Sequence, residues 1–393
     1  MMENKKKEEN QFSHGQLVKA YNAAIHYYLH RNGDGSLRKQ QEVAEEVNLK
    51  PPRFSEFLNI AWKAGMIDVI ITPPESINKD ATAIRELEIK LLQKLQQISP
   101  PLLDPSGVMI RPHKLINVHV VPNAAGNIEE PVNISIDETS EYGSVTARIC
   151  KRAAREFLTV IDDHYQQLCS HGEAKLYCGV GWSRTCERVV NLLPVPVEQY
   201  PDLVVCPFTG LIGSRQTSID ANFLAFRLAA KLSADSIKLS CPSIQPIDMN
   251  IETLRPIARA LDCINLCRIG ISGIGVAYDR EHPEQTQLLV RQVIDRKQLE
   301  RVRELGGIAE IHCHYFDMQG NLISFEDLQF KPIGITLGNM KQMSRFMIVV
   351  SPDHRKILPT IIAIKAGICS DLVLDHTMAH FMLSDEHDAE LGF

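Results

Sequence analysis

The stretch "LYCGVGWSRT", residues 176–185, joins an apolar strand pattern to two glycines and then to a polar segment typical of a helix start. Exposed backbone amides at the start of a helix bind anions, and Ser183, Arg184 and Thr185 place hydroxyl and guanidinium donors nearby. A Gly-x-Gly after a strand is also typical of tight packing between that strand and the next helix. The stretch therefore predicts either an anion site or a close packing contact at the end of a strand.

The sequence around this stretch, from residue 143 onward, alternates short apolar runs with segments of helical periodicity. We expect helices at 144–169, 183–191, 220–232 and 353–366, and strands in "KLYCGVGW", "DLVVCPF", "SIKLSCPSI", "CINLCRIGISGIG", "GIAEIHCHYFD", "RFMIVVS" and "SDLVLD". Apolar strands of four to six residues between helices predict a mostly parallel α/β sheet with both faces covered. Ligands of such sheets bind at the carboxyl ends of the strands.

The N-terminal part has a different pattern. Helices are expected over 13–31, 38–47 and 52–64, followed by "MIDVIITPP", an alternating strand stopped by two prolines. This order is the plan of a winged helix-turn-helix module, although such a module can also bind another protein. Glu56 is either a solvated charge or an acceptor for a cytosine amine. The outward residues of the third helix are the candidate DNA contacts: Lys50, Arg53, Ser55, Glu56, Asn59 and Lys63.

A connecting segment is expected between these two parts. Its helix, 80–98, carries an apolar stripe that fits either an amphipathic helix packed on the next domain or a dimerising coiled coil. The stripe consists of Ile84, Leu87, Leu91, Leu95 and Ile98. A buried strand, "LINVHVVP", follows between loops at 99–114 and 122–142. The expected organisation is therefore a disordered tail at 1–12, a winged helix-turn-helix domain at 13–74, a linker at 75–142 and an α/β domain at 143–393.

Composition limits the class of protein. The 393 residues are 44% hydrophobic and 23% charged, with a formal charge of -6, which is typical of a soluble globular chain. No run of 18 apolar residues is present, and the charged start does not resemble a secretory signal peptide. Ten cysteines are dispersed without a CxxC pair, which favours a reducing cytoplasm over a disulfide framework. We expect a cytoplasmic protein that does not bind a membrane.

Several motifs together resemble one family. "QEVAEEVNLKPPRFSEFLNIAWKAGMIDVII" (41–71), "GVGWSRT" (179–185), "VVCPFTGLIG" (204–213), "GGIAEIHCHYFDMQGNLIS" (306–324) and the segment 333–379 are similar, in this order, to SorC-type sugar-binding transcriptional regulators. The resemblance implies a mixed fold, with a winged helix-turn-helix and a Rossmann-like domain related to sugar-phosphate isomerases and CoA-transferases. It also implies operator DNA as a partner, a phosphorylated sugar or polyol as effector, and assembly into dimers or tetramers.

The resemblance also suggests which residues bind the effector. Glu310 stands at a strand start, where it can accept hydrogen bonds from sugar hydroxyls. Lys365 falls near a family position that contacts the phosphate, and Thr209 stands where some members carry a basic ligand. The expected effector-binding residues are Gly181, Trp182, Ser183, Arg184, Thr185, Thr209, Gly210, Arg291, Glu310 and Lys365. No catalytic residue, cofactor or metal is expected.

Three other interpretations remain open. An isomerase-like enzyme would use Glu310 with Lys365 or His312 as an acid/base pair. A scaffold would bind neither DNA nor a ligand. A metal site would combine His312 and His314, expected on one face of a strand, with Asp375, His376 and His380. Because the sequence contains no nucleophile elbow, Walker A loop or HExxH helix, a non-enzymatic regulator is the preferred hypothesis.

Overall fold

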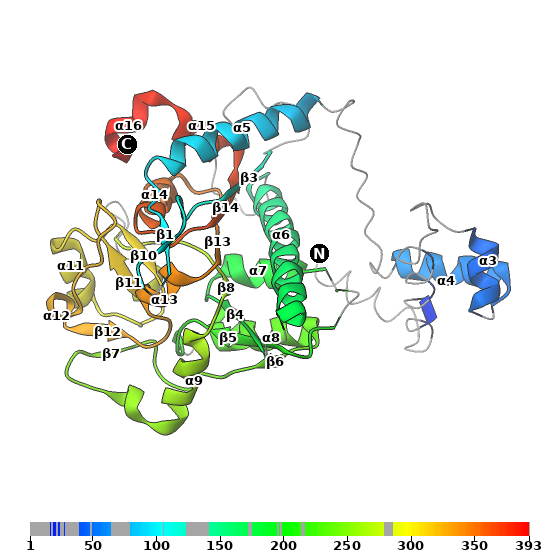
Figure 1. Cartoon of the computed structure of the whole chain (residues 1–393), viewed down its shortest axis with the longest axis horizontal. Coiled ribbons are helices and arrows are strands. Elements are labelled where there is room, and N and C mark those ends of the chain that lie inside the picture. Colours follow the sequence, from blue (N-terminus) through cyan, green and yellow to red (C-terminus); the bar gives the residue numbers. More distant parts are fainter. Residues whose placement is uncertain are drawn as a thin grey trace. The chain divides into compact units, whose positions relative to one another are not determined.

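The computed structural model of the chain describes residues 16, 19–20, 23, 27, 39–47, 49–63, 79–104, 106–122, 141–171, 175–194, 196, 199–213, 217–278 and 286–392 (Figure 1). Contacts divide the chain into two compact units, Met1–Asn78 and Lys79–Phe393. The predicted tail 1–12 and wing strand 66–74 lie outside the described residues, as does most of the predicted loop 122–142. Among the described residues, no helix is both long and apolar enough to cross a membrane.

The smaller unit contains α3 (Gln40–Glu46) and α4 (Pro51–Lys63). Pro51 occupies the first position of α4, where its missing N–H costs no helical hydrogen bond. The helices pack through a small core of Ala20, Ala23, Val43, Ala44, Phe54, Phe57, Leu58 and Ile60. The predicted helices 38–47 and 52–64 are thus confirmed to within two residues at each end. The winged form stays a prediction because the wing is not described.

The larger unit is built on a seven-stranded parallel sheet with the order β3-β14-β13-β8-β4-β5-β6. Strands β5 and β6 lie beside β4 on one side of the sheet. Strands β13 and β14 lie beside β8 on the opposite side. The strand order therefore reverses between β4 and β8, which is where such sheets bind ligands. The strands are β3 (Asn117–Val121), β4 (Leu176–Val180), β5 (Leu203–Pro207), β6 (Asp235–Ser236), β8 (Ile269–Ser272), β13 (Arg345–Val349) and β14 (Asp371–Asp375).

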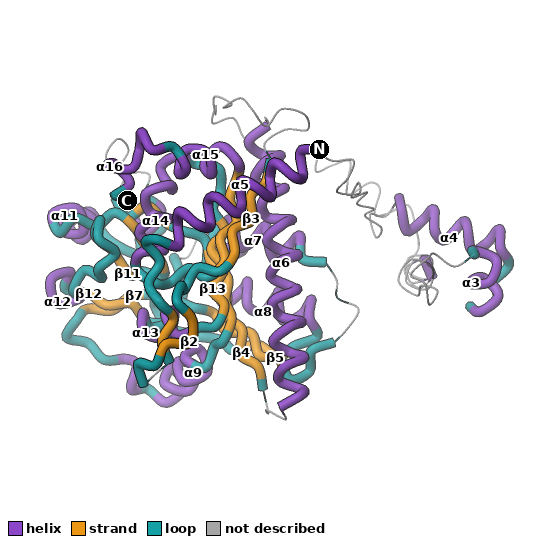
Figure 2. Tube along the Cα trace, turned by 45° about the horizontal axis from the view of Figure 1, so that its top comes forward, coloured by secondary structure: helices purple, strands orange, loops and turns teal. Residues whose placement is uncertain are grey.

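Helices cover both faces of this sheet, as the apolar strands predict. One face carries α6 (Glu141–His171), which Figure 2 shows lying along the strands, together with α7 (Arg184–Leu192) and α8 (Ala221–Leu232). The other face carries α5 (Lys79–Gln96), α9 (Arg255–Asn265), α14 (Ile357–Lys365) and α15 (His376–Leu383). Alternate residues of β5 serve the two cores, Val204 and Cys206 on one side and Leu203 and Val205 on the other.

Small antiparallel sheets and short helices complete the unit. The sheets pair β9 (Gly275–Val276) and β11 (His314–Phe316) with β10 (Ala309–Ile311), β7 (Ile244–Pro246) with β12 (Phe330–Pro332), and β1 (Leu102–Leu103) with β2 (Met109–Arg111). The helices are α10 (Gln287–Val290), α11 (Arg296–Glu304), α12 (Phe325–Leu328), α13 (Leu337–Gln342) and α16 (Asp388–Leu391), with 3-10 turns at Thr217–Ile219, Ile251–Thr253, His354–Lys356 and Asp385–His387.

The segment 79–121 packs within the larger unit, although the sequence predicts that it is part of a linker. Leu87, Leu91 and Leu95 of α5 are buried, and the helix lies against β3 and α15. The amphipathic interpretation of this helix is confirmed, because its apolar stripe already contacts its own unit. The predicted strand "LINVHVVP" is confirmed as β3 at the edge of the sheet.

Two strand predictions are wrong. "GIAEIHCHYFD" is not one strand but the hairpin β10–β11, whose two-residue turn consists of His312 and Cys313 with φ of 53° and 63°. Both positions are left-handed, as tight hairpin turns require, but no glycine marks the turn in the sequence. His312 and His314 therefore do not share a strand face. In "SIKLSCPSI" only Ser236 and Ile244 belong to strands, since β6 ends at Ser236 and β7 begins at Ile244.

Candidate ligand-binding site

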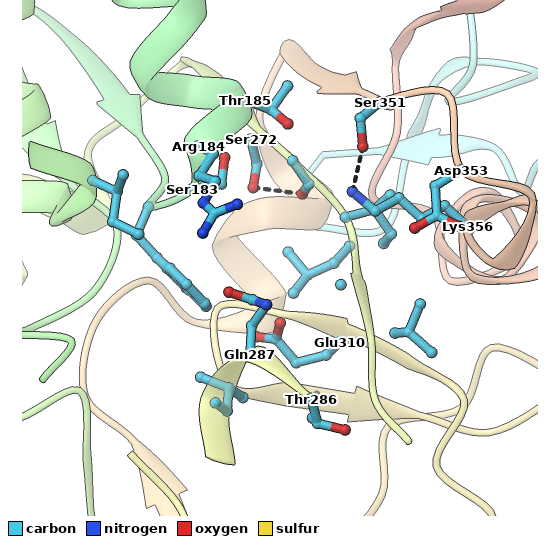
Figure 3. A pocket seen from close by; sticks show the side chains of 18 of the residues that line it. Ser183, Arg184, Thr185, Ser272, Thr286, Gln287, Glu310, Ser351, Asp353 and Lys356 are labelled. Carbon is cyan, nitrogen blue, oxygen red and sulfur yellow. Dashed lines mark hydrogen bonds between the residues drawn. The ribbon is translucent and has the colours of Figure 1, made fainter. Parts of the chain in front are cut away.

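A cavity of about 310 Å³ lies at the carboxyl ends of β4, β8 and β13 (Figure 3). Ser183 follows β4, Gly273 follows β8 and Ser351 follows β13, and all three line the cavity. Because β4 and β8 are the pair between which the strand order reverses, the cavity occupies the place that the parallel topology predicts for a ligand.

The end of β4 supplies the first group of cations. Ser183 caps α7, since its Oγ accepts a hydrogen bond of 2.8 Å from the backbone N–H of Cys186. Arg184 and Arg188, one turn apart on the exposed side of α7, both line the cavity, as does the buried Thr185. The N-terminal end of a helix carries partial positive charge, so this wall combines two guanidinium groups with a favourable dipole.

The segment after β13 supplies the second group. The ammonium of Lys356 donates a 2.6 Å hydrogen bond to Ser351 Oγ, and burial lowers the pKa of Lys356 while Asp353 opposes that shift. Asp353 also pairs with Arg355 at 3.0 Å. A bound anion beside Lys356 would favour its charged form, because an opposite charge stabilises the ammonium.

The third wall comes from the hairpin β10–β11 and from α10. Glu310 accepts a 2.6 Å hydrogen bond from the backbone N–H of Cys313, and burial raises the pKa of Glu310 to about 7. At neutral pH this carboxyl group can therefore both donate and accept hydrogen bonds. Thr286 and Gln287 lie near Glu310 in the view of Figure 3.

The glycines of the Gly-x-Gly motif allow close packing. A Cβ at Gly179 would lie 1.8 Å from Phe208 Cε1, and a Cβ at Gly181 would lie 2.4 Å from His312 Cε1. Both approaches are too short for any side chain, so only glycine fits at these two positions. The motif therefore packs closely, but the nearest atoms belong to Phe208, His312 and Ser272 and not to the next helix, which the packing interpretation had predicted.

The structure brings six of the ten predicted effector residues to the cavity. These are Trp182, Ser183, Arg184, Thr185, Arg291 and Glu310. The guanidinium of Arg291 lies 5.8 Å from the centre of the Trp182 ring, within range of a cation–π interaction. Gly181 lies behind His312 and shapes the cavity without lining it.

The other three predicted residues do not line the cavity. Thr209 is buried and bridges to Gly334, while a Cβ at Gly210 would lie 2.3 Å from the carbonyl oxygen of Cys241. Lys365 ends α14 and donates to the backbone carbonyl of Gly392 at 2.8 Å. The nine residues of α14, which span about 13 Å, separate Lys365 from the cavity-lining Lys356.

Several lining residues are absent from the sequence-based predictions, chiefly Arg188, Ser351, Arg355 and Lys356. The rule that ligands bind after parallel strands would have pointed to Ser351 and Lys356, because they follow the apolar run "RFMIVVS". Arg188 follows Arg184 by four residues and therefore shares its helix face. His312, which also lines the cavity, was predicted only as an acid/base or metal-binding residue in the alternative interpretations.

The candidate DNA contacts lie on α4, except Lys50, which directly precedes the helix. Lys50, Arg53, Ser55, Glu56 and Asn59 are exposed. Arg53 Nη1 pairs with Glu56 Oε2 at 2.8 Å, and Ser55 donates to Gln40 Oε1 at 3.1 Å. Lys63 is the last residue of α4. Glu56 thus offsets the charge of Arg53 on this face.

The proposed metal ligands are not gathered in one place. His312 lies in the hairpin turn, and the rings of His376 and His380 are 5.9 Å apart on α15. Among the described residues, no group of three or more His, Cys, Asp and Glu side chains is arranged to hold a metal ion.

The fold and cavity define a doubly wound α/β ligand-binding domain joined to a helical N-terminal unit. Residues 162–384 match the family described as "Putative sugar-binding domain", and the chain belongs to this family. Over 214 residues it is 25% identical to the uncharacterized transcriptional regulator YjhU of Escherichia coli K12. That match covers 53% of this chain and 61% of the relative, less than two thirds of its length.

Solved structures share the fold at low sequence identity. The full-length sorbitol operon regulator SorC from Klebsiella pneumoniae is 16% identical with a TM-score of 0.57, and the match covers 94% of this chain and 99% of that one. A transcriptional regulator from Streptococcus pneumoniae is 16% identical with a TM-score of 0.59, covering 79% of this chain and 99% of that one. The predicted resemblance to sugar-binding transcriptional regulators is confirmed.

Proposed function

We propose that the chain is a transcriptional regulator whose affinity for operator DNA is controlled by a phosphorylated sugar or polyol bound in the cavity. The observation that carries this proposal is the convergence of basic side chains from two strand ends on one cavity at the β4–β8 reversal. Arg184 and Arg188 follow β4, Arg355 and Lys356 follow β13, and a fifth basic residue, Arg291, follows α10. The acidic residues in the described lining are Glu310 and Asp353.

The chemistry of these residues supports a phosphorylated ligand. Guanidinium groups bind phosphate oxygens in pairs, and a lysine ammonium adds a compact charge. The volume, about 310 Å³, is at the small end of the range for ligand pockets. It therefore favours a small ligand with one charged end over a large cofactor.

The DNA-binding half of the proposal rests on the smaller unit. Helices α3 and α4 pack through one core and leave the polar face of α4 exposed. The names of the relatives agree with this role, because YjhU and SorC are both described as regulators. As a dimer or tetramer, the chain would present several such units, and an effector would change affinity by altering their spacing on DNA.

Glu310 also favours a second candidate function, a sugar-phosphate isomerase. A carboxyl group with a pKa of about 7 in a ligand cavity has the properties of a general acid or base. Turnover of sugar phosphates by the purified chain distinguishes the two functions, because a regulator returns its effector unchanged.

The test of the regulator proposal is calorimetry with glucose 6-phosphate, ribose 5-phosphate, sorbitol 6-phosphate and the corresponding unphosphorylated compounds. At least one phosphorylated compound is expected to bind more tightly than its unphosphorylated form. Arg184→Ala should weaken that binding by about tenfold or more, since it removes a charged hydrogen-bond donor. The control is Arg301→Ala on α11, which changes the net charge equally and lies outside the cavity lining.

DNA binding is tested separately. Fragments selected from genomic DNA by the full chain should shift in a gel, and the best phosphorylated ligand should change their affinity. The ligand half of the proposal is contradicted if the wild type ignores every phosphorylated compound. The DNA half fails if no fragment is enriched.

A further inference from the structure

The His312 side chain is buried in the cavity wall without a hydrogen-bond partner among the described residues. It is 3% exposed, lines the cavity, and neither Nδ1 nor Nε2 has a partner there. A buried polar atom left unpaired destabilises the folded state, so such groups call for an explanation. Each nitrogen exposes less than 1 Å² in the empty protein, so a ligand in the cavity would provide a partner once the ring turns toward it.

The surrounding residues hold the ring in place. Phe208 and Phe346 pack against it, with centroids 5.2 Å and 6.4 Å away. Gly181 lies beneath it, close enough that any Cβ there would overlap the ring. The backbone of His312 is left-handed, a conformation that asparagine, aspartate and histidine adopt more often than other non-glycine residues. The two phenylalanine rings and Gly181 therefore restrict how far the ring can move.

Thr286 shows the same feature on the same cavity. Its side chain is 6% exposed, and its Oγ1 has no partner among the described residues. Thr286 precedes α10 but makes no side-chain capping bond to that helix. The carboxyl group of Glu310 lines the same cavity and uses one oxygen to hold the hairpin turn.

These three groups share one chemistry. A hydroxyl, a neutral imidazole and a carboxyl with a pKa of about 7 each both donate and accept hydrogen bonds. Burial lowers the pKa of His312 to about 3, so the ring carries no charge at neutral pH and adds nothing to anion binding. Such a set matches the hydroxyl groups of a polyol and does not match a second phosphate.

We infer that His312 and Thr286, together with Glu310, form a hydroxyl-recognition subsite that selects a singly phosphorylated ligand with free hydroxyls at its other end. The inference rests on the proposed function, because the cations after β4 and β13 hold the phosphate. It goes further by naming the residues that distinguish a polyol phosphate from a simple anion and from a bisphosphate.

The simpler interpretation is that His312 only fills space between Phe208 and Phe346. In that case a leucine of similar size would serve equally well, and the ligand preference would not change. The two interpretations therefore differ in one measurable quantity, the ratio of affinities for a polyol phosphate and for inorganic phosphate.

The experiment measures that ratio by calorimetry for glucose 6-phosphate, sorbitol 6-phosphate, ribose 5-phosphate and fructose 1,6-bisphosphate, each against inorganic phosphate. In the wild type at least one monophosphate should bind more tightly than both inorganic phosphate and the bisphosphate. His312→Leu and Thr286→Val should each reduce that preference about three- to tenfold, the value of one or two hydrogen bonds, and should leave inorganic phosphate unchanged. His312→Asn should retain part of the preference, since an amide also donates and accepts.

The matched control is His314→Leu. His314 is equally buried and lies two residues further along the hairpin, but it does not line the cavity. Thermal unfolding without ligand shows whether each variant is folded. The inference is overturned if His312→Leu and His314→Leu leave the ratio equally unchanged, or if no monophosphate binds more tightly than inorganic phosphate. Neither result removes the anion site, whereas loss of all phosphate binding in the wild type removes the proposed function as well.

Discussion

On the sheet side of the cavity, formed by the segments after β4 and β13, charged groups line the wall and Lys356 and Arg355 already have polar partners. On the hairpin side, formed by Thr286, Glu310 and His312, neutral groups are buried, and two of them have no partner among the described residues. The sheet side belongs to a parallel sheet, and the hairpin side includes a tight antiparallel turn.

This difference suggests a division of roles. Exposed or paired cations cost little in the empty protein and attract any anion, so they provide affinity without much selectivity. Buried polar groups without a partner destabilise the empty protein, and a ligand whose hydroxyls pair with them removes that destabilisation. A ligand without such hydroxyls leaves these groups unpaired and therefore binds less tightly. The sheet side should therefore control how tightly phosphate binds, and the hairpin side should control which phosphate compound binds.

The largest effect is expected where the two sides meet. Gly181→Ala would place a Cβ 2.4 Å from the His312 ring, and overpacking of this kind costs about 1–3 kcal/mol. Urea unfolding should show that loss, and His312→Ala in the same chain should recover much of it. Gly338→Ala is the control, because its Cβ would meet only Thr336 Oγ1 at 3.9 Å. If Gly181→Ala and Gly338→Ala are equally stable, the His312 ring does not pack against Gly181 as described.

A second test separates affinity from stability. Lys356→Met removes the cation that contacts Ser351 and should weaken inorganic phosphate about tenfold or more, because a charged hydrogen bond is lost. The same change should alter the unfolding free energy less than Gly181→Ala does. Calorimetry and urea unfolding on one preparation check both values. A variant that loses stability but keeps its phosphate affinity would reverse the roles assigned to the two sides.

The hairpin side should also make stability depend on pH. Burial raises the pKa of Glu310 to about 7, so between pH 4.5 and 7 the folded chain keeps a proton that the unfolded chain releases. The contribution of Glu310 is therefore full below pH 4.5 and is lost as the pH rises to 7. Unfolding curves of the wild type and Glu310→Gln should diverge in this window. Parallel curves would show that the carboxyl group is not buried as described.

His312 should act in the opposite direction. Burial lowers the pKa of His312 from 6.5 to about 3. Between these pH values the unfolded chain binds a proton at this residue and the folded chain does not. Its contribution is present above pH 6.5 and is lost as the pH falls toward 3. His312→Asn should remove this part of the acid destabilisation in the same unfolding series. If the wild type and His312→Asn lose the same stability at acid pH, the imidazole ring is in contact with water.

The smallest effect is expected at Arg355. Its charge is already offset by Asp353 at 3.0 Å, and exposed ion pairs contribute little. Arg355→Ala should change phosphate affinity less than about threefold, clearly less than Lys356→Met. A loss as large as that of Lys356→Met would mean that the pair opens to bind the ligand.

Local patterns in the sequence predict much of the fold. The strands around Leu176–Val180 and Arg345–Val349 are apolar runs bounded by helices, and those signals need no knowledge of distant residues. The hairpin turn at His312 was missed because its left-handed positions hold histidine and cysteine instead of glycine. The carboxyl group of Glu310 stabilises this turn by accepting a hydrogen bond from the backbone N–H of Cys313.

The site was harder to predict, because a cavity depends on which strand ends become neighbours. Ser183, Arg184 and Thr185 were found because they form one continuous stretch after a strand. Lys356 follows an apolar run, but that pattern does not show that β13 ends near β4, and the family resemblance points to Lys365 instead. The order of strands in the sheet decides between them, and that order is a property of the whole chain.

The central claim is that one cavity binds phosphate on its sheet side and hydroxyls on its hairpin side. The most direct measurement is a crystal structure of the full chain with the tightest-binding monophosphate of the calorimetric series. The account predicts a phosphate beside Arg184 and Lys356, with ligand hydroxyls within hydrogen-bond distance of His312 and Thr286. A ligand bound outside this cavity, or with its phosphate beside His312, would contradict it.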